Sequence, residues 1–342
     1  MRAVLIDAPN VIHLENLPDP TPLPDELVIR VEACGICGTD LHIIDGDSPL
    51  ARYPLVPGHE FAGEVVEIGD KIAQDERYQR LGLRVGSRVA VDPNLPCRIC
   101  EFCRTGHENL CRKYRALGVT MNGGFAEYVS VPVTQAYPLP DTISWREAAL
   151  IEPLSCAVHG MHRLNLMPGD SLLIAGAGTM GLLLLQLAVH GGASQVAVVD
   201  TNTQRLGYAK RLGATITASS LEQVAQDYPA GFHRVIDATG IPSVMESAFT
   251  LVRRGGTFMI FGVAAPTSQL SLSPFQIYNS EITILGSMAV LFSFQPALDI
   301  ISQGIIDTAI MLTKAYALAD FSQAIADVRS GAGIKTQILP TT

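Results

Sequence analysis

Two stretches in the N-terminal half of the chain carry residue types that bind a catalytic metal ion. Cys37 lies in the sequence Gly-Ile-Cys-Gly-Thr-Asp at residues 35–40, and Gly58, His59 and Glu60 follow further along the chain. Thiolate, imidazole and carboxylate are ligands of a Zn²⁺ ion that keeps one coordination position open for water or substrate. Because an isolated cysteine is more often a small buried hydrophobic residue, this interpretation needs support from elsewhere in the sequence.

A second group of metal-binding residues consists of four cysteines that lie close together in the sequence. Two residues separate each of the first three, and seven separate the last pair. Four thiolates fill the tetrahedral coordination of zinc and leave no open position, so this site is expected to be structural. The alternatives are four free or paired cysteines, or an iron–sulfur cluster. A separate hydride-transfer motif in the chain favours zinc. The four residues are Cys97, Cys100, Cys103 and Cys111, in a predicted lobe at residues 93–113.

A glycine-rich motif predicts a binding site for a dinucleotide. The short apolar segment 171–175 is typical of a buried parallel strand, and the motif Gly-x-Gly-x-x-Gly follows it at once, before the apolar helix expected at 182–189. Such glycines allow a tight turn and close approach to a pyrophosphate, which the free N–H groups of the helix bind. Its cofactor-binding residues are Gly176, Gly178, Thr179, Met180 and Gly181.

Asp200, which ends the next predicted strand, favours NAD over NADP. It lies 19 residues after the last glycine of the motif. There a carboxylate accepts hydrogen bonds from ribose hydroxyls and repels a 2′-phosphate. Arg205 complicates this prediction because a nearby guanidinium tolerates a phosphate, and we include it among the residues expected near the cofactor. The alternative role for Asp200 is a helix N-cap.

The composition indicates a globular protein that does not bind nucleic acid or membranes. With 342 residues the chain is long enough for two domains, and it is 48% hydrophobic and 17% charged. A net charge of −9 argues against a phosphate-backbone partner and an anionic membrane surface. We expect no membrane span and no signal peptide. Cysteines clustered at metal spacing without a secretory signal favour zinc over disulfides and a cytoplasmic location.

The elements expected to position these residues change character along the chain. Strands are predicted at 27–33, 63–69 and 84–91, in a bent or barrel-like sheet. Ser144, followed by Glu147, is a helix-capping pattern. From about residue 168 strands and helices alternate, as in a parallel sheet. Later strands are expected at 195–200, 235–240, 256–262, 281–287 and 335–339.

Together these motifs resemble the zinc-dependent medium-chain alcohol dehydrogenases over nearly the whole chain. Within that family the chain looks most like the polyol branch, which is sorbitol dehydrogenase-like. The resemblance implies an α/β fold, with a GroES-like β-rich catalytic domain and a Rossmann-fold cofactor domain. It rests on residues 35–40 with His42, on 58–60, on the four cysteines, and on 123–128, 152–155 and 176–181. The implied domains are residues 1–153 for catalysis, 154–289 for NAD, and 290–342 returning to the catalytic domain.

The resemblance also assigns roles to individual residues. Cys37, His59 and, as in polyol-type relatives, Glu60 are expected to bind the catalytic zinc. Glu152 is expected to bind it directly or through water. Thr39 and His42 follow Cys37 by two and five residues. At these spacings the family has a hydroxyl and an imidazole that relay a proton. Residues expected on the nicotinamide side are Phe261, Gly262, Val263, Ser287 and Met288, whereas Cys34, Cys156 and His159 are expected to be structural.

The resemblance implies an enzyme with two zinc ions per chain, one catalytic and one structural, and with NAD as cofactor. It would oxidise a secondary hydroxyl of a polyol or sugar-derived substrate to a ketone, as a homodimer or homotetramer. The alternatives are an L-threonine 3-dehydrogenase, and a dehydrogenase of a sugar acid or sugar phosphate. A zinc- and NAD-binding protein without activity is a further alternative, but all the expected catalytic residues are present together.

Overall fold

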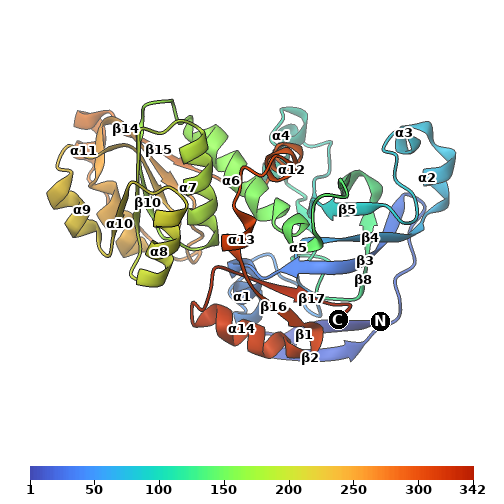
Figure 1. Cartoon of the computed structure of the whole chain (residues 1–342). Coiled ribbons are helices and arrows are strands. Elements are labelled where there is room, and N and C mark those ends of the chain that lie inside the picture. Colours follow the sequence, from blue (N-terminus) through green and yellow to red (C-terminus); the bar gives the residue numbers. More distant parts are fainter. The chain divides into compact units, whose positions relative to one another are not determined.

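The computed structural model describes residues 1–342, which form two compact units (Figure 1). Unit 1 comprises Met1–Ser155, Val290–Gln303 and Leu312–Thr342, and unit 2 comprises Cys156–Ala289 and Gly304–Met311. Residues 304–311, which the sequence-based division assigned to the returning segment, therefore pack with unit 2. There the backbone N–H of Asp307 donates a hydrogen bond to Gln186 Oε1 at 2.7 Å.

Unit 1 is built on a seven-stranded sheet whose organising strand is β3 (Glu26–Gly35). The strands run in the order β16-β17-β3-β4-β5-β9, and β8 also pairs with β3. Because β3 is ten residues long, it pairs with β8 at its start, with β17 at its last two residues and with β4 along most of its length. All pairs are antiparallel except β16 with β17.

Besides this sheet, unit 1 contains the β1–β2 hairpin (Figure 1) and a second pair of strands, β6 with β7, at the two ends of the four-cysteine lobe. The strands of unit 1 are β1 (Arg2–Ala8), β2 (Val11–Asn16), β3, β4 (Glu60–Ile68), β5 (Arg88–Val91), β6 (Asn94–Leu95), β7 (Arg115–Ala116), β8 (Tyr128–Pro132), β9 (Ala136–Pro138), β16 (Leu312–Ala317) and β17 (Lys335–Leu339). The helices are α1 (Gly38–Asp45), α2 (Asp70–Gln74), α3 (Glu76–Gln79), α4 (Glu101–Arg104), η1 (Glu108–Leu110), η2 (Val133–Gln135), α5 (Trp145–Ala148), α12 (Phe294–Ser302), η3 (Leu318–Asp320) and α14 (Phe321–Arg329).

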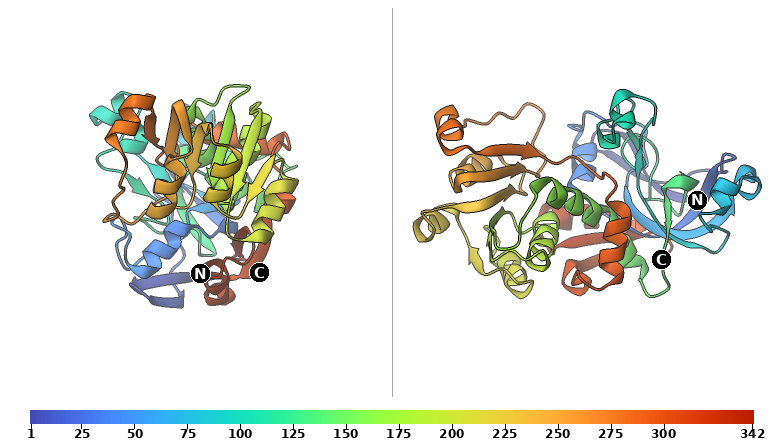
Figure 2. Two further views of the ribbon diagram at one scale, coloured as in Figure 1. Left: turned by 90° about the vertical axis from the view of Figure 1, so that its left-hand side faces the viewer. Right: turned by 90° about the horizontal axis from the view of Figure 1, so that it is seen from above.

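Unit 2 is a six-stranded parallel sheet in the order β12-β11-β10-β13-β14-β15, with helices packed around it (Figure 2). Helix α6 (Ile151–Leu164) leads into it from unit 1. The strands are β10 (Ser171–Ala175), β11 (Gln195–Val199), β12 (Ile216–Ala218), β13 (Phe232–Asp237), β14 (Val252–Ile260) and β15 (Thr283–Gly286). The helices are α7 (Thr179–His190), α8 (Thr203–Arg211), α9 (Leu221–Asp227), α10 (Pro242–Phe249), α11 (Pro274–Ser280) and α13 (Thr308–Met311).

Each unit has its own apolar core. In unit 1, Phe61 and Phe125 are buried, and the ring of Phe125 packs edge-on against Phe321 with centroids 5.0 Å apart. Aromatic pairs of this kind contribute about 0.5–1.5 kcal/mol beyond their buried area, so this pair helps to join α14 to the loop that precedes β8. In unit 2, Phe249 and Phe258 make a similar contact under the sheet.

Most strands and the Ser144 cap are confirmed by the structure. Ser144 Oγ accepts a hydrogen bond from the Glu147 N–H, and α5 begins at the next residue. The sequence missed the β1–β2 hairpin and β16, and it made the strand at 84–91 too long, since β5 begins at Arg88. The reason is that these edge strands lack a strict alternation of polar and apolar residues. None of the helices is both long and apolar enough to span a bilayer.

Candidate metal and cofactor sites

Three residues expected to bind the catalytic zinc lie together in unit 1. One ligand atom from each of Cys37, His59 and Glu60 falls within 4.8 Å of the other two, and His59 and Glu60 are buried. A thiolate, an imidazole and a carboxylate with a fourth position open are a donor set that zinc takes in catalytic sites. The arrangement therefore fits the metal that the sequence predicts.

Local structure explains how Cys37 is held. Cys37 is the N-cap residue of α1, and its extended backbone places it just before the first helical turn. Asp40, which is fully buried, accepts a hydrogen bond from the Cys37 N–H at 2.8 Å. An acid at the third helical position stabilises a helix start in this way. The motif Cys-Gly-Thr-Asp is thus a helix cap that fixes a metal ligand.

Asp40 also contacts the second ligand. Its Oδ1 atom lies 3.5 Å from Nδ1 of His59, so the carboxylate orients the imidazole and leaves Nε2 for the metal. Burial alone would lower the pKa of His59, but the charges of Asp40 and Cys37 outweigh burial and raise this pKa well above its ordinary value. Zinc binds the neutral imidazole, so metal binding competes with protonation of His59.

Glu60 has a buried cation beside it, which the sequence analysis did not assign. Lys335, the first residue of β17, is 2% exposed, and its Nζ pairs with Glu60 Oε2 and donates to the Ile36 carbonyl at 2.9 Å. Gly35 makes room for this pair, because a Cβ there would lie 2.0 Å from Glu60 Oε2. Burial lowers the pKa of Lys335, but Glu60 and Cys37 raise it more, so the side chain stays charged.

The other expected catalytic residues differ in their surroundings. Thr39 Oγ1 lies 3.9 Å from Cys37 Sγ, whereas His42 is partly exposed and its Nδ1 lies 2.9 Å from Asp47 Oδ1. Glu152 is buried near the start of α6 but does not belong to the compact ligand group. Its role at the metal, directly or through water, stays a prediction, and so does the relay through Thr39 and His42.

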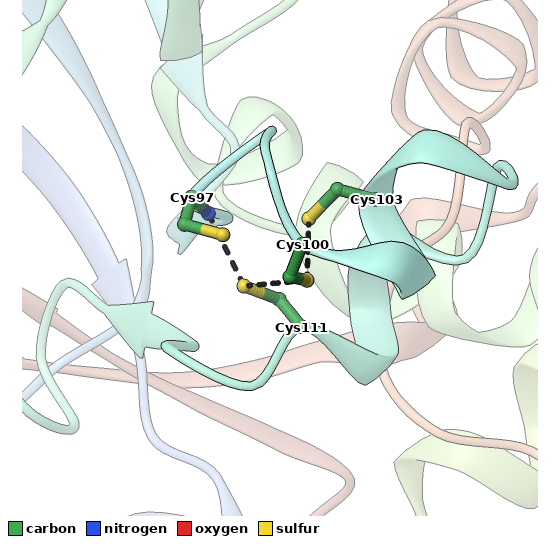
Figure 3. Close-up of side chains that lie close together, drawn as sticks. All are labelled: Cys97, Cys100, Cys103 and Cys111. Carbon is green, nitrogen blue, oxygen red and sulfur yellow. Dashed lines mark hydrogen bonds between the residues drawn. The ribbon is translucent and has the colours of Figure 1, made fainter.

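The four clustered cysteines form a second, separate group (Figure 3). Their sulfur atoms all lie within 4.8 Å of one another, and Cys100 Sγ is 3.5 Å from Cys103 Sγ and 4.0 Å from Cys111 Sγ. Tetrahedral zinc with Zn–S bonds of about 2.3 Å separates its sulfurs by about 3.8 Å. Backbone N–H groups of Cys103 and Arg112 lower the pKa of Cys100 to about 6, whereas burial and the neighbouring thiols raise the pKa of Cys103 to about 12. None of the seven cysteines of the chain forms a disulfide, so disulfides do not compete with the metal.

In unit 2 the glycine motif joins β10 to α7. Gly176 has a φ of +105°, and a Cβ on Gly181 would lie 1.8 Å from the Gly176 carbonyl oxygen, so neither position accepts another residue without a shift. Gly178 is the N-cap of α7, and Thr179 and Met180 form its first turn. The first N–H groups of a helix have no partner within the helix, and they make such a helix start suited to a pyrophosphate.

Asp200 holds the glycine loop from the neighbouring strand. Its Oδ2 accepts a hydrogen bond from the Ala177 N–H at 2.7 Å, and its Oδ1 accepts one from the Asn202 N–H at 2.8 Å. Asn202 is the N-cap of α8, so Asp200 does not have that alternative role. A carboxylate has about four acceptor positions, which leaves capacity for ribose hydroxyls. Arg205 lies in the first turn of α8.

The residues expected on the nicotinamide side follow the last two parallel strands. Phe261, Gly262 and Val263 form the turn after β14, and Ser287 and Met288 follow β15. Both segments meet α6 at a glycine, since a Cβ on Gly160 would lie 2.7 Å from the Phe261 ring and 3.6 Å from Ser287 Oγ. The carboxyl ends of parallel strands are where such sheets bind ligands.

Two residues that complete the metal site were missed from sequence. Asp40 lies inside the motif that carries Cys37, and it could have been found as the acid at the third position of a helix. Lys335 could have been noticed as a charged residue opening an otherwise uncharged strand, because lysine is rarely buried unless it is paired. Nothing in the sequence shows, however, that this strand ends beside Glu60.

Comparisons with known protein families match both units. The family described as alcohol dehydrogenase GroES-like domain matches residues 23–141, and the family described as zinc-binding dehydrogenase matches residues 179–303. The first match covers Cys37, His59, Glu60 and the four-cysteine lobe, and the second begins within the glycine motif. Each match therefore falls on residues that the geometry already groups.

Individual relatives are similar over nearly the whole chain. D-arabinitol dehydrogenase 1 of Uromyces fabae is 33% identical, with 99% of this chain and 97% of the relative covered. Sorbitol dehydrogenase of Bacillus subtilis is 33% identical, with coverages of 95% and 92%. A zinc-binding dehydrogenase from Sinorhizobium meliloti 1021, solved with NADP bound, is 34% identical and superimposes with a TM-score of 0.93 over 99% of both chains.

The four-cysteine lobe predicts a loss of one zinc ion when one of its thiolates is removed. For Cys103→Ser we expect bound zinc to fall from two ions to one per chain, because a hydroxyl is a poor zinc ligand. Atomic absorption on dialysed protein measures this. The matched control is Cys156→Ser, which should keep both ions. Two ions bound to the Cys103→Ser protein would contradict the structural site.

The buried pair of Glu60 and Lys335 predicts a substitution whose effect depends on zinc. Lys335→Met leaves Glu60 buried without its cation, so metal-free protein should lose about 3 kcal/mol of unfolding free energy. Zinc-loaded protein should lose less, since the metal neutralises the same carboxylate, and zinc should bind more tightly.

Urea unfolding with zinc and after chelation measures this difference. Lys314→Met, which removes a more exposed partner of Asp327, is the control and should lose less than about 1 kcal/mol in both states. An equal loss with and without zinc for Lys335→Met would show that Lys335 does not share Glu60 with the metal.

Proposed function

The chain belongs to the zinc-binding medium-chain alcohol dehydrogenase family, and on this premise we propose which residues carry its reaction and on what substrate. The reaction is NAD-dependent oxidation of a secondary hydroxyl group of a polyol or sugar-derived compound to a ketone. Cys37, His59 and Glu60 hold the catalytic zinc, and Cys97, Cys100, Cys103 and Cys111 hold the structural zinc. The observation that carries this proposal is the compact group of three different ligand types in unit 1.

Bound zinc supplies a Lewis acid that lowers the pKa of a substrate hydroxyl, and NAD accepts the hydride. The chain's own residues prepare this chemistry. Asp40 orients His59, and Lys335 balances the charge of Glu60. Thr39 and His42 on α1 carry the released proton toward solvent. Because Asp47 occupies Nδ1 of His42, Nε2 is the nitrogen left to exchange that proton.

Unit 2 binds the cofactor through the residues of its strand ends. The α7 N-terminus with Gly176, Gly178 and Gly181 takes the pyrophosphate, and Asp200 takes the adenosine ribose. The carboxylate of Asp200 disfavours a 2′-phosphate, which supports NAD. Because a solved relative contains NADP, the test must compare NAD with NADP.

The substrate class is supported by the names of the relatives. Those described above act on D-arabinitol and sorbitol according to their names, and a further relative is named D-altritol 5-dehydrogenase. These names favour a polyol over L-threonine. A sugar acid stays within the same class, since another relative is named L-galactonate-5-dehydrogenase.

An exposed strand edge supports assembly into a homodimer or homotetramer. Strand β15 is the last of the parallel sheet, so its outer edge has no neighbour in the chain. Ile284 on this strand is 36% exposed, and Phe275 and Tyr278 on the preceding α11 are 71% and 83% exposed. An open apolar edge is a template for pairing with another strand, and a second copy of β15 pairs with it about a two-fold axis. Seven cysteines without a disulfide support a cytoplasmic location, which imaging of a fluorescent fusion tests.

Initial rates of NAD reduction across a panel of alcohols test the proposed function. The panel contains sorbitol, xylitol, arabitols, galactitol, hexonates and L-threonine, each with NAD and with NADP. We expect one polyol or sugar acid to react fastest and with NAD. Cys37→Ser should lose turnover on the order of 100-fold or more, whereas Cys156→Ser should keep it. Full turnover and full zinc content in Cys37→Ser would refute the assignment of the metal site.

The mass of the intact assembly tests the proposed interface. Native mass spectrometry of the 36.6 kDa chain should give a dimer or tetramer, and Ile284→Lys on the strand edge should shift it toward smaller species. Leu23→Lys, at a position 60% exposed in unit 1, serves as the control. An unchanged assembly in Ile284→Lys, or a monomeric unmodified protein, would rule out pairing through β15.

A further inference from the structure

A buried carboxylate at the end of β13 lies outside every role assigned so far. Asp237 is 0% exposed, and the groups that bind its carboxylate are all neutral. Its Oδ1 accepts hydrogen bonds from Thr239 Oγ1 at 2.5 Å and from the Thr239 N–H at 3.2 Å, and its Oδ2 accepts one from the Gly240 N–H at 3.0 Å. Burial raises the pKa of Asp237, and these neutral donors oppose the rise.

The same residue contacts the turn that follows β14. The main-chain oxygen of Asp237 accepts hydrogen bonds from the N–H groups of Phe261 at 3.0 Å and Gly262 at 2.9 Å. A Cβ on Gly262 would lie 2.2 Å from the Gly240 nitrogen and 2.8 Å from Asp237 Oδ2. The turns after β13 and β14 are therefore packed backbone to backbone, with the carboxylate between them.

On its other side the turn after β13 reaches the glycine loop. Thr239 Cγ2 lies 3.0 Å from the position that a Cβ on Gly176 would take, and the Ala238 N–H donates to the Ala175 carbonyl at 2.8 Å. Since β10 and β14 are the two neighbours of β13, the turn at residues 237–240 stands between the glycine loop and the Phe261–Val263 turn.

A purely local role does not account for this carboxylate. The helix that follows, α10, has Ile241 as its N-cap and receives no side-chain cap, so Asp237 is not a capping residue. A buried carboxylate is also an expensive way to hold a turn, because its charge must be removed from water. The carboxylate fixes Thr239 and Gly240, which in turn pack against the two neighbouring loops.

We propose that Asp237 is a positioning residue for the dinucleotide. By fixing Thr239 and Gly240, it sets the spacing between the loop that takes the pyrophosphate and the turn that faces the nicotinamide. This inference rests on the proposed use of NAD and adds to it residues that do not themselves touch the reacting atoms. Asp237 should therefore strengthen the binding of a whole dinucleotide. It should not strengthen the binding of a nucleotide that lacks nicotinamide.

Asp237→Asn separates positioning from simple folding. An amide has one acceptor oxygen, so it cannot accept from both Thr239 and Gly240, and one buried donor loses its partner. We expect NADH to bind about tenfold more weakly. ADP, which reaches the glycine loop and Asp200 but has no nicotinamide, should bind within about twofold of the unmodified protein. NADH fluorescence titration and displacement of NADH by ADP measure both affinities.

Two substitutions of Thr239 provide a graded test. Thr239→Val keeps the methyl group beside Gly176 but removes the hydroxyl that donates to Asp237, so it should weaken NADH binding without weakening ADP binding. Thr239→Ser keeps the hydroxyl and should restore NADH affinity close to that of the unmodified protein. Thr250→Val is the matched control, because Thr250 Oγ1 donates to the Ser247 carbonyl on the exposed end of α10, and it should change neither affinity.

The possible results either support or overturn the role of Asp237. A selective loss of NADH binding in Asp237→Asn and Thr239→Val, with rescue in Thr239→Ser, supports the inference. Equal weakening of NADH and ADP, or no change in either, overturns it while leaving the proposed function intact. If Asp237→Asn does not fold, the ratio of the two affinities in Thr239→Val decides in the same way. An unmodified protein that fails to bind NADH overturns both the proposed function and this inference.

Discussion

The structure of unit 1 depends on neutralising several negative groups that are buried together. When zinc is bound, Cys37, Asp40 and Glu60 each carry a negative charge within one region of the core. Isolated charges of this kind are strongly unfavourable away from water. Lys335 supplies one positive charge and the metal supplies two, so with His59 neutral they balance the charges of these three groups. The metal is therefore part of the electrostatic balance of the fold as well as of the reaction.

Three strands of unit 1, β3, β4 and β17, meet beside the metal site and bring these charged groups together. Residue Gly35 at the end of β3 pairs with Glu60 at the start of β4, and the end of β3 also pairs with β17. A Cβ at position 35 would lie 2.0 Å from Glu60 Oε2 and 2.7 Å from Lys335 Cε, so glycine there leaves space for both side chains. The C-terminal segment thus completes the metal site, which explains why the chain returns to unit 1 after forming unit 2.

Carboxylates bound by backbone N–H groups recur at each functional loop. Asp40 binds the Cys37 N–H, Asp200 binds the Ala177 N–H, and Asp237 binds the N–H groups of Thr239 and Gly240. Hydrogen bonds from N–H groups to a charged acceptor are stronger than those between neutral groups. The hydrogen bonds to each of these acids fix the backbone of its loop. The loops are therefore ordered before metal or cofactor binds.

The sequence predicts those parts of the site that are local in the chain. The spacing of the cysteines, the glycine motif and Asp200 each lie within one short segment, and the fold class and the Ser144 cap are confirmed for the same reason. The role of Lys335 could not be predicted, because its partner Glu60 is 275 positions away in the sequence (335 minus 60). Only the pairing of β17 with β3 brings the two residues together. The Asp237 contacts likewise depend on which strands are neighbours in the sheet, which no local pattern reveals.

The central claim is that Cys37, His59 and Glu60 form a zinc site separate from the four-cysteine lobe. Crystals of the zinc-loaded protein, with anomalous diffraction recorded on both sides of the zinc absorption edge, test it most directly. The account predicts two peaks per chain, one within bonding distance of Cys37 Sγ and His59 Nε2 and one at the centre of the four cysteine sulfurs. A peak at the four cysteines alone, or a second peak away from Cys37 and His59, would contradict it.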